Sequence, residues 1–181
     1  LGYKREGDVA FLAAQGAAKG FSVRAIDLVE STADHLKVSS TRVRELLQAG
    51  KVAEARDLLG RGYALGGEVV HGKKRGKGLG FPTANIAVWD RQIIPANGVY
   101  AGWGYLRGER YMAMTNVGIS PVFMNESVTV EAHLLDFDAD IYGQTLTITF
   151  EKYLRPEGKY DSLDALIAQI HRDVAEGRAY L

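Results

Sequence analysis

The chain has 181 residues, with 22 Lys and Arg against 22 Asp and Glu, so no net charge attracts nucleic acid or an anionic membrane. It contains no cysteine, which excludes disulfides, thiolate chemistry and Cys-ligated zinc. No apolar run approaches the roughly 18 residues of a membrane span, and the cysteine-free composition favours a cytoplasmic protein. We therefore expect no nucleic-acid or membrane partner, and the composition is compatible with a homo-oligomer.

Residues 1–60 are predicted to be mostly helical. The expected order is a helix over 8–19, a strand over 21–28, a helix capped within 39–41 and ending at Gly50, and a helix over 52–59. A single strand cannot form a sheet, so this part is expected to be the remnant of a larger α/β domain.

From Tyr63 the pattern changes to short alternating strands, and a domain border is expected near residue 60, with domains 1–60 and 61–181. Six strands are predicted, over 63–71, 83–88, 98–106, 110–117, 127–136 and 144–150. Short strands with tight connections favour a closed antiparallel barrel. A last helix after Ser162 is expected to pack on the barrel with the stripe Leu163, Leu166, Ile167, Ile170 and Val174. The predicted fold class is mainly β (α+β), a six-stranded antiparallel β-barrel with a C-terminal helix.

The segment Gly67–Asn85 holds the pattern most suggestive of chemistry. Glycines at 72, 76, 78 and 80 free the backbone to present N–H groups to an anion, and four basic residues over 73–77 add positive charge. A solvated basic hairpin explains the composition equally well.

Thr83 and Asn85 follow this loop at alternate positions after Pro82. A hydroxyl and an amide oxygen are neutral ligands of the kind that Mg²⁺ accepts when phosphate and water complete its octahedron. Turn-capping by the same two side chains is the alternative.

Several stretches together resemble the riboflavin kinase family. They are Gly80-Phe-Pro-Thr-Ala-Asn85, Pro95-Ala-Asn-Gly-Val-Tyr100, Asn116-Val-Gly118, Glu131-Ala-His-Leu-Leu-Asp-Phe-Asp138, Ile141-Tyr-Gly143, Tyr153-Leu-Arg-Pro-Glu157 and Tyr160-Asp-Ser-Leu163. The resemblance implies a six-stranded barrel that transfers the γ-phosphate of ATP to the 5′-hydroxyl of riboflavin, with Mg²⁺. It implies that Thr83 and Asn85 hold the metal and the ATP phosphates, and that Gly72 and Lys77 contact nucleotide.

The resemblance also implies that Glu131 is the catalytic base. In the predicted strand Glu131 lies on the more polar face, opposite Val130 and Ala132, where a carboxylate could accept a proton from an alcohol. Without the surrounding motif, a surface carboxylate on a strand is the simpler interpretation. Arg155 and Tyr160 are implied as flavin-binding residues, although charge pairing is an equal alternative for Arg155.

Residues Val38-Ser-Ser-Thr-Arg-Val-Arg44 resemble the end of the FMN adenylyltransferase module of bacterial bifunctional FAD synthetases. That module also carries a His-x-Gly-His stretch, and His35, His71, His133 and His171 form no such pair. We therefore expect this sequence to make FMN but not FAD.

Two other functions compete with a kinase. One is a non-catalytic flavin- or nucleotide-binding barrel that uses the same pocket as a sensor. The other is a nucleic-acid-binding barrel that uses residues 73–77, which the balanced charge and the absence of a row of aromatic residues disfavour.

Overall fold

The computed structural model describes residues 7–26, 30, 38–72, 80–122 and 125–181, without the side chains of residues 120–127. The described residues fall into two compact units, residues 1–38 and 39–181. Each unit is described by itself.

The described residues of the first unit contain one helix, α1 (Val9–Lys19). The Asp8 carboxylate caps it by accepting a hydrogen bond from the Phe11 backbone N–H at 2.7 Å, and Gly20 ends it at a φ of 77°. The prediction of this helix is confirmed. The predicted strand over 21–28 is wrong for residues 21–26, which are not in a strand; residues 27 and 28 lie outside the described residues. Ile26 is 88% exposed, so the alternation that suggested a strand has no sheet to pack against.

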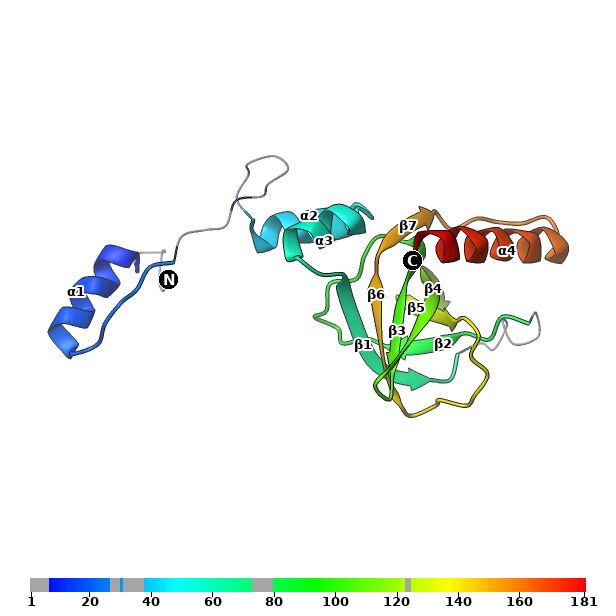
Figure 1. The fold of residues 1–181 in the computed structure, drawn as a ribbon, viewed down its shortest axis with the longest axis horizontal. Coiled ribbons are helices and arrows are strands. Elements are labelled where there is room, and N and C mark those ends of the chain that lie inside the picture. The colour runs from blue at the N-terminus through cyan, green and yellow to red at the C-terminus, as the bar shows by residue number, and fades with distance from the viewer. Residues whose placement is uncertain (1–6, 27–29, 31–37, 73–79, 123–124) are drawn as a thin grey trace. The chain divides into compact units, whose positions relative to one another are not determined.

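The second unit begins with two short helices, α2 (Ser40–Gln48) and α3 (Val52–Leu59). The Ser39 hydroxyl caps α2 by accepting a hydrogen bond from the Arg42 backbone N–H. Leu47, Val52 and Ala55 are fully or almost fully buried and belong to the core of the barrel. The helices cover one end of the barrel (Figure 1). The change from helix to strand near residue 60 therefore lies inside one packed unit.

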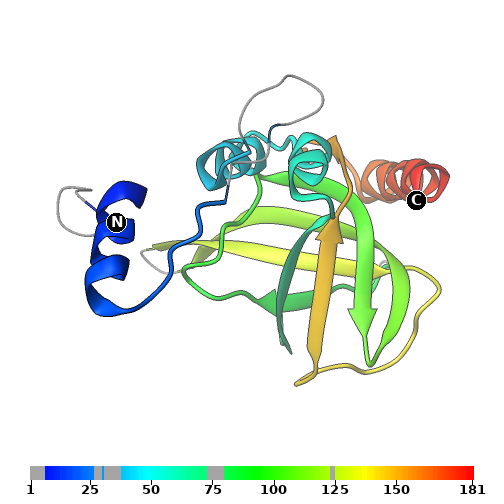
Figure 2. The ribbon, with the colours of Figure 1, turned by 60° about the vertical axis from the view of Figure 1, so that its left-hand side comes forward.

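The barrel is antiparallel throughout. Its strands are β1 (Tyr63–Val70), β2 (Ala84–Ala87), β3 (Gly98–Leu106), β4 (Glu109–Val122), β5 (Asn125–Leu134) and β6 (Thr145–Phe150). They follow the order β4-β5-β2-β1-β6-β3, and pairing of β3 with β4 closes the ring (Figure 2). The prediction of a closed six-stranded barrel is confirmed. The sequence interpretation missed the short strand β7 (Lys152–Arg155), which pairs with β3 from Val99 to Ala101.

Alternate residues of each strand fill the barrel, as the pleat of a strand requires. On β5, Val130, Ala132 and Leu134 point into this core, and Tyr100 and Phe150 meet edge to face with ring centroids 5.1 Å apart. The side chains between the core residues therefore lie on the outer surface, and that surface carries the polar groups described below.

The last helix, α4 (Leu163–Tyr180), is capped by Ser162 and packs on β3, β4 and β7. The predicted apolar stripe is wrong at its first position, because Leu163 is 55% exposed. The most buried residues of α4 are Asp173 and Gly177. A Cβ at Gly177 would lie 2.5 Å from Met114 Sδ, so the missing side chain allows the helix to approach the sheet closely. No helix in the described part of the chain is both long enough and apolar enough to cross a membrane.

Candidate active site

Three polar side chains form a row on the outer face of the barrel. Asn85 on β2 and Asn116 on β4 are both paired directly with Glu131 on β5. Residues directly opposite each other on antiparallel strands point to the same face of the sheet. The Glu131 carboxylate therefore lies between two amides and is held by a strand on each side.

Thr83 completes this group from the residues just before β2. Its hydroxyl donates a hydrogen bond to Glu131 Oε2 at 3.1 Å. Gly72 lies against the Asn85 side chain, because a Cβ at this glycine would be 2.5 Å from Asn85 Oδ1 and closer still to Nδ2 and Cγ. Four predicted site residues are thus brought together, whereas Lys77 lies outside the described residues.

A cavity of about 420 Å³ opens between this row and helix α4, and we call it the α4-side pocket. Thr83, Asn116 and Glu131 form its polar edge. Its apolar walls are Phe81, Val99, Met114, Leu166 and Ile170. An apolar slot with polar groups along one edge suits a flat heteroaromatic ligand with an attached polar chain.

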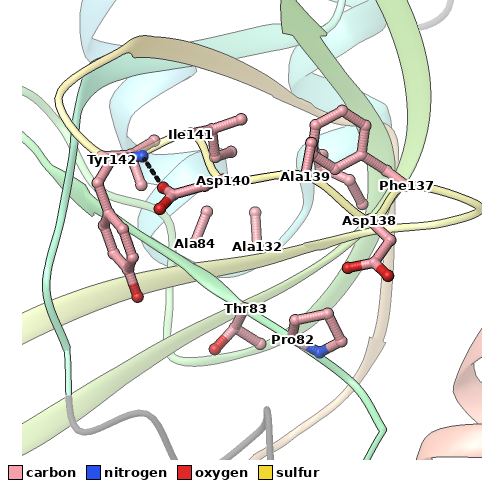
Figure 3. Close-up of a pocket in the computed structure, with 12 residues that line it drawn as sticks. Pro82, Thr83, Ala84, Ala132, Phe137, Asp138, Ala139, Asp140, Ile141 and Tyr142 are labelled. Carbon is pink, nitrogen blue, oxygen red and sulfur yellow. Dashed lines mark hydrogen bonds between the residues drawn. The ribbon is translucent and has the colours of Figure 1, made fainter.

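A second cavity of about 320 Å³, which we call the loop-side pocket, lies under residues 137–142. Figure 3 shows Pro82 and Thr83 across this pocket from Ile141. The Tyr142 N–H donates to Asp140 Oδ1 at 3.0 Å, and the Tyr142 ring packs on His71 with centroids 3.9 Å apart. Thr83 lines both pockets, so ligands in the two pockets would meet beside the Thr83–Glu131 hydrogen bond.

The predicted flavin-binding residues, Arg155 and Tyr160, both line the α4-side pocket. The Arg155 guanidinium, however, already donates to the buried Asp173 carboxylate at 2.7 to 3.1 Å and to Pro156 O at 3.0 Å. The hydrogen bonds to Asp173 raise the pKa of Arg155 above its ordinary value. Arg155 therefore joins β7 to α4 and forms a wall of the pocket, with the Tyr160 ring 5.8 Å from its Cζ.

Residue-by-residue interpretation of the sequence gave no role to Asn116, Glu157 or His133. The Asn116 Nδ2 donates to Glu157 Oε1 at 3.1 Å, and all three residues line the α4-side pocket. Asn116 belongs to one of the stretches that carry the family resemblance, but only the β4–β5 register reveals that it lies opposite Glu131.

The two pockets share Thr83, whose hydroxyl is hydrogen-bonded to the Glu131 carboxylate, and such an arrangement suits an enzyme that transfers a group between two small molecules. A family model described as "Flavokinase: Riboflavin kinase" matches residues 59–181. The chain belongs to the riboflavin kinase family, and residues 59–181 form its riboflavin kinase domain. These comparisons give no support to the alternative of a non-catalytic binding barrel.

Curated relatives similar to nearly the whole chain are named bifunctional riboflavin kinase/FMN adenylyltransferase. The protein from Listeria monocytogenes is 37% identical over 180 residues, which are 99% of this chain and 56% of the relative. The protein from Pseudomonas fluorescens is 40% identical over 180 residues, 99% of this chain and 57% of the relative. The chain thus spans little more than half the length of these relatives.

Two solved structures are also similar. A crystal structure described as a macrolide-efflux protein from Streptococcus pneumoniae has a TM-score of 0.83 and 35% identity, covering 94% of this chain and 54% of that one. The riboflavin kinase from Trypanosoma brucei has a TM-score of 0.50 and 32% identity, covering 65% of this chain and 78% of that one.

Proposed function

We propose that this riboflavin kinase domain transfers the γ-phosphate of ATP to the 5′-hydroxyl of riboflavin, with Glu131 as the general base. The observation that carries the assignment is the hydrogen bond between Thr83 and Glu131 at the junction of the two pockets. The apolar α4-side pocket suits the isoalloxazine ring, and Arg155 and Tyr160 form part of its wall. The loop-side pocket is then left for the nucleotide, and the family resemblance implies that Gly72 and Lys77 contact it.

The geometry of Glu131 supports its role as a base. One carboxylate oxygen accepts the Thr83 hydrogen bond, while Oε1 has no hydrogen-bond partner among the described residues. Oε1 can therefore accept the proton of the riboflavin hydroxyl as that oxygen attacks the γ-phosphorus. The bond from the γ-phosphorus to the bridging oxygen breaks, and ADP leaves. Phosphoryl transfer asks the protein mainly for positioning and charge neutralisation, and a group fixed by two neighbouring strands provides the positioning.

The oxygen ligands near Glu131 fit a magnesium ion that is held by few protein groups. Among the described residues no cluster of three or more histidines or carboxylates could hold a metal. Mg²⁺ in nucleotide sites takes one or two protein oxygens and completes its shell with phosphate and water. The Thr83 hydroxyl and the Asn85 amide oxygen are such groups, and we propose that they hold Mg²⁺ and the ATP phosphates. The ion would neutralise the charge of the phosphates.

The proposal is tested by incubating the protein with riboflavin, ATP and Mg²⁺ and separating the flavins by chromatography. FMN should accumulate. A Glu131→Gln variant keeps the shape of the side chain but cannot take a proton, so kcat should fall at least about 100-fold. Riboflavin binding, followed by quenching of flavin fluorescence, should persist.

The matched control is Glu68→Gln, which changes an exposed carboxylate on β1 that lines neither pocket. It should keep wild-type turnover. Unchanged turnover in Glu131→Gln would refute the base assignment, and absence of FMN with the wild-type protein would refute the kinase function.

For a longer protein that contains this chain, we propose adenylation of FMN as a second activity, with residues 1–60 as part of the module responsible. The support is that relatives of about twice the length are named for both activities, riboflavin kinase and FMN adenylyltransferase. The same chromatogram tests the expectation for the present sequence, which is FMN without FAD.

A further inference from the structure

The segment Phe81–Thr83 carries the Thr83 hydroxyl to Glu131, yet it is not part of a strand. The β2–β5 ladder contains two pairs, Ala84 with Ala132 and Asn85 with Glu131, and it stops there. One step further, Thr83 would stand opposite His133, but no such pair forms. The backbone that orients Thr83 therefore lacks the ladder hydrogen bonds that fix Asn85.

A side-chain contact from β5 holds this segment where the ladder pairing has ended. His133 Nδ1 lies 2.8 Å from the carbonyl oxygen of Pro82. His133 is two residues after Glu131 on β5, so its side chain leaves the strand on the same outer face as the carboxylate. One strand thus provides both the group that accepts the Thr83 hydrogen bond and the group that holds the peptide just before Thr83.

We propose that His133 is a positioning residue, which holds the Pro82 carbonyl and thereby keeps the Thr83 hydroxyl on Glu131. The proposal rests on the function proposed above for Thr83 and Glu131. A carbonyl oxygen can only accept a hydrogen bond, so Nδ1 of His133 carries the proton and donates it. His133 needs no contact with the reacting atoms to act in this way.

Phe81 gives the segment a second attachment, which provides a control. The Phe81 ring meets His133 edge to face at 5.6 Å and meets His171 of α4 in the same manner at 5.2 Å. Both imidazoles pack on one ring, but His133 alone has a hydrogen bond to the backbone of this segment among the described residues. Replacing His171 therefore removes a similar ring contact and leaves the bond to Pro82.

The test compares two amide replacements at position 133. An Asn side chain can place its N–H₂ close to the position of Nδ1, whereas a Gln side chain places it closer to that of Nε2. His133→Asn should keep kcat for FMN formation within about threefold of wild type. His133→Gln should lower kcat at least about tenfold, because displacement of a reacting group by 1 Å can cost about 100-fold. The control His171→Gln should stay within about threefold, and thermal melting should show all three variants folded.

An equal loss of kcat in His133→Asn and His133→Gln would overturn the proposal, because loss of packing alone would explain it. A wild-type kcat in both variants would also overturn it. NMR of the wild-type protein gives a measurement independent of the variants. The proposal expects the proton on Nδ1 of His133, and a spectrum with Nδ1 unprotonated at neutral pH would overturn it. If the wild-type protein makes no FMN, the proposed function fails instead, while the state of Nδ1 still tests the hydrogen bond.

Discussion

Replacing Gly72 with Ala should abolish most of the kinase activity and leave the barrel folded. A Cβ at this position would lie 2.5 Å from Asn85 Oδ1, whereas ordinary contacts begin near 3.4 Å. The amide must therefore move by about 1 Å. It is the free end of a side chain on the outer surface, so the movement costs little stability. Displacement of a reacting group by this distance can cost about 100-fold in rate, and we expect kcat/KM for ATP to fall by a factor of 10 to about 100.

The assay measures FMN formation at varied ATP and Mg²⁺, together with the melting temperature. Gly66→Ala is the matched control, because Gly66 lies on β1, the strand that ends two residues before Gly72, and lines neither pocket. The nearest atom to a Cβ at Gly66 would be the Thr147 side-chain oxygen, at 3.0 Å. The Gly66→Ala variant should keep the wild-type kcat/KM for ATP. A Gly72→Ala protein with wild-type kcat/KM for ATP would show that catalysis does not depend on the position of the Asn85 amide.

Three further predictions concern stability. Leu47→Ala should lower the free energy of unfolding by about 2–5 kcal/mol in urea titrations, because Leu47 is fully buried in the barrel core, while Leu163→Ala at an exposed site should change it by less than about 0.5 kcal/mol. Arg155→Met should lower the free energy of unfolding by about 3–5 kcal/mol in the same titration, because it leaves the buried carboxylate of Asp173 without its cation. A loss of riboflavin affinity with unchanged stability would instead favour direct contact between Arg155 and the flavin. Burial raises the pKa of the Tyr100 hydroxyl above its ordinary value of 10.0, so the unfolded chain loses this proton before the folded protein does. The free energy of unfolding should therefore fall as the pH rises above 10. Melting curves at pH 9 to 11 measure this fall, and a melting temperature that does not change with pH would contradict it.

The strands of the barrel could be predicted from the sequence because their signals are local. Alternation along 127–136 predicted β5, and the short gap between the predicted strands 98–106 and 110–117 indicated the hairpin between β3 and β4, which turns at Arg107 and Gly108. Both turn residues have positive φ, at 53° and 86°, as a tight two-residue hairpin turn requires. The strand β7 was missed because its four residues are all half-buried and show no alternation.

The parts of the site that could not be predicted depend on register and packing. Thr83, Asn85 and Glu131 were proposed by resemblance, and their proximity rests on the β2–β5 pairing. The place of Asn116 in the site could not be predicted without knowing which residue of β4 faces Glu131. The contact between His133 and Pro82 depends on the place where the β2–β5 ladder ends, which a single sequence does not reveal.

The register of the closed barrel is therefore the feature on which the proposed chemistry depends. Glu131 is paired on both sides, and a shift of one residue along β5 would exchange it with a core position such as Val130 or Ala132. The buried alternation of β5 forbids that shift, because it would place a carboxylate in the apolar interior. The same residues that stabilise the core thus fix the base on the outer face, beside Thr83, which lines both pockets. A reaction that needs mainly positioning can be supported in this way by a fold that contributes few reactive groups.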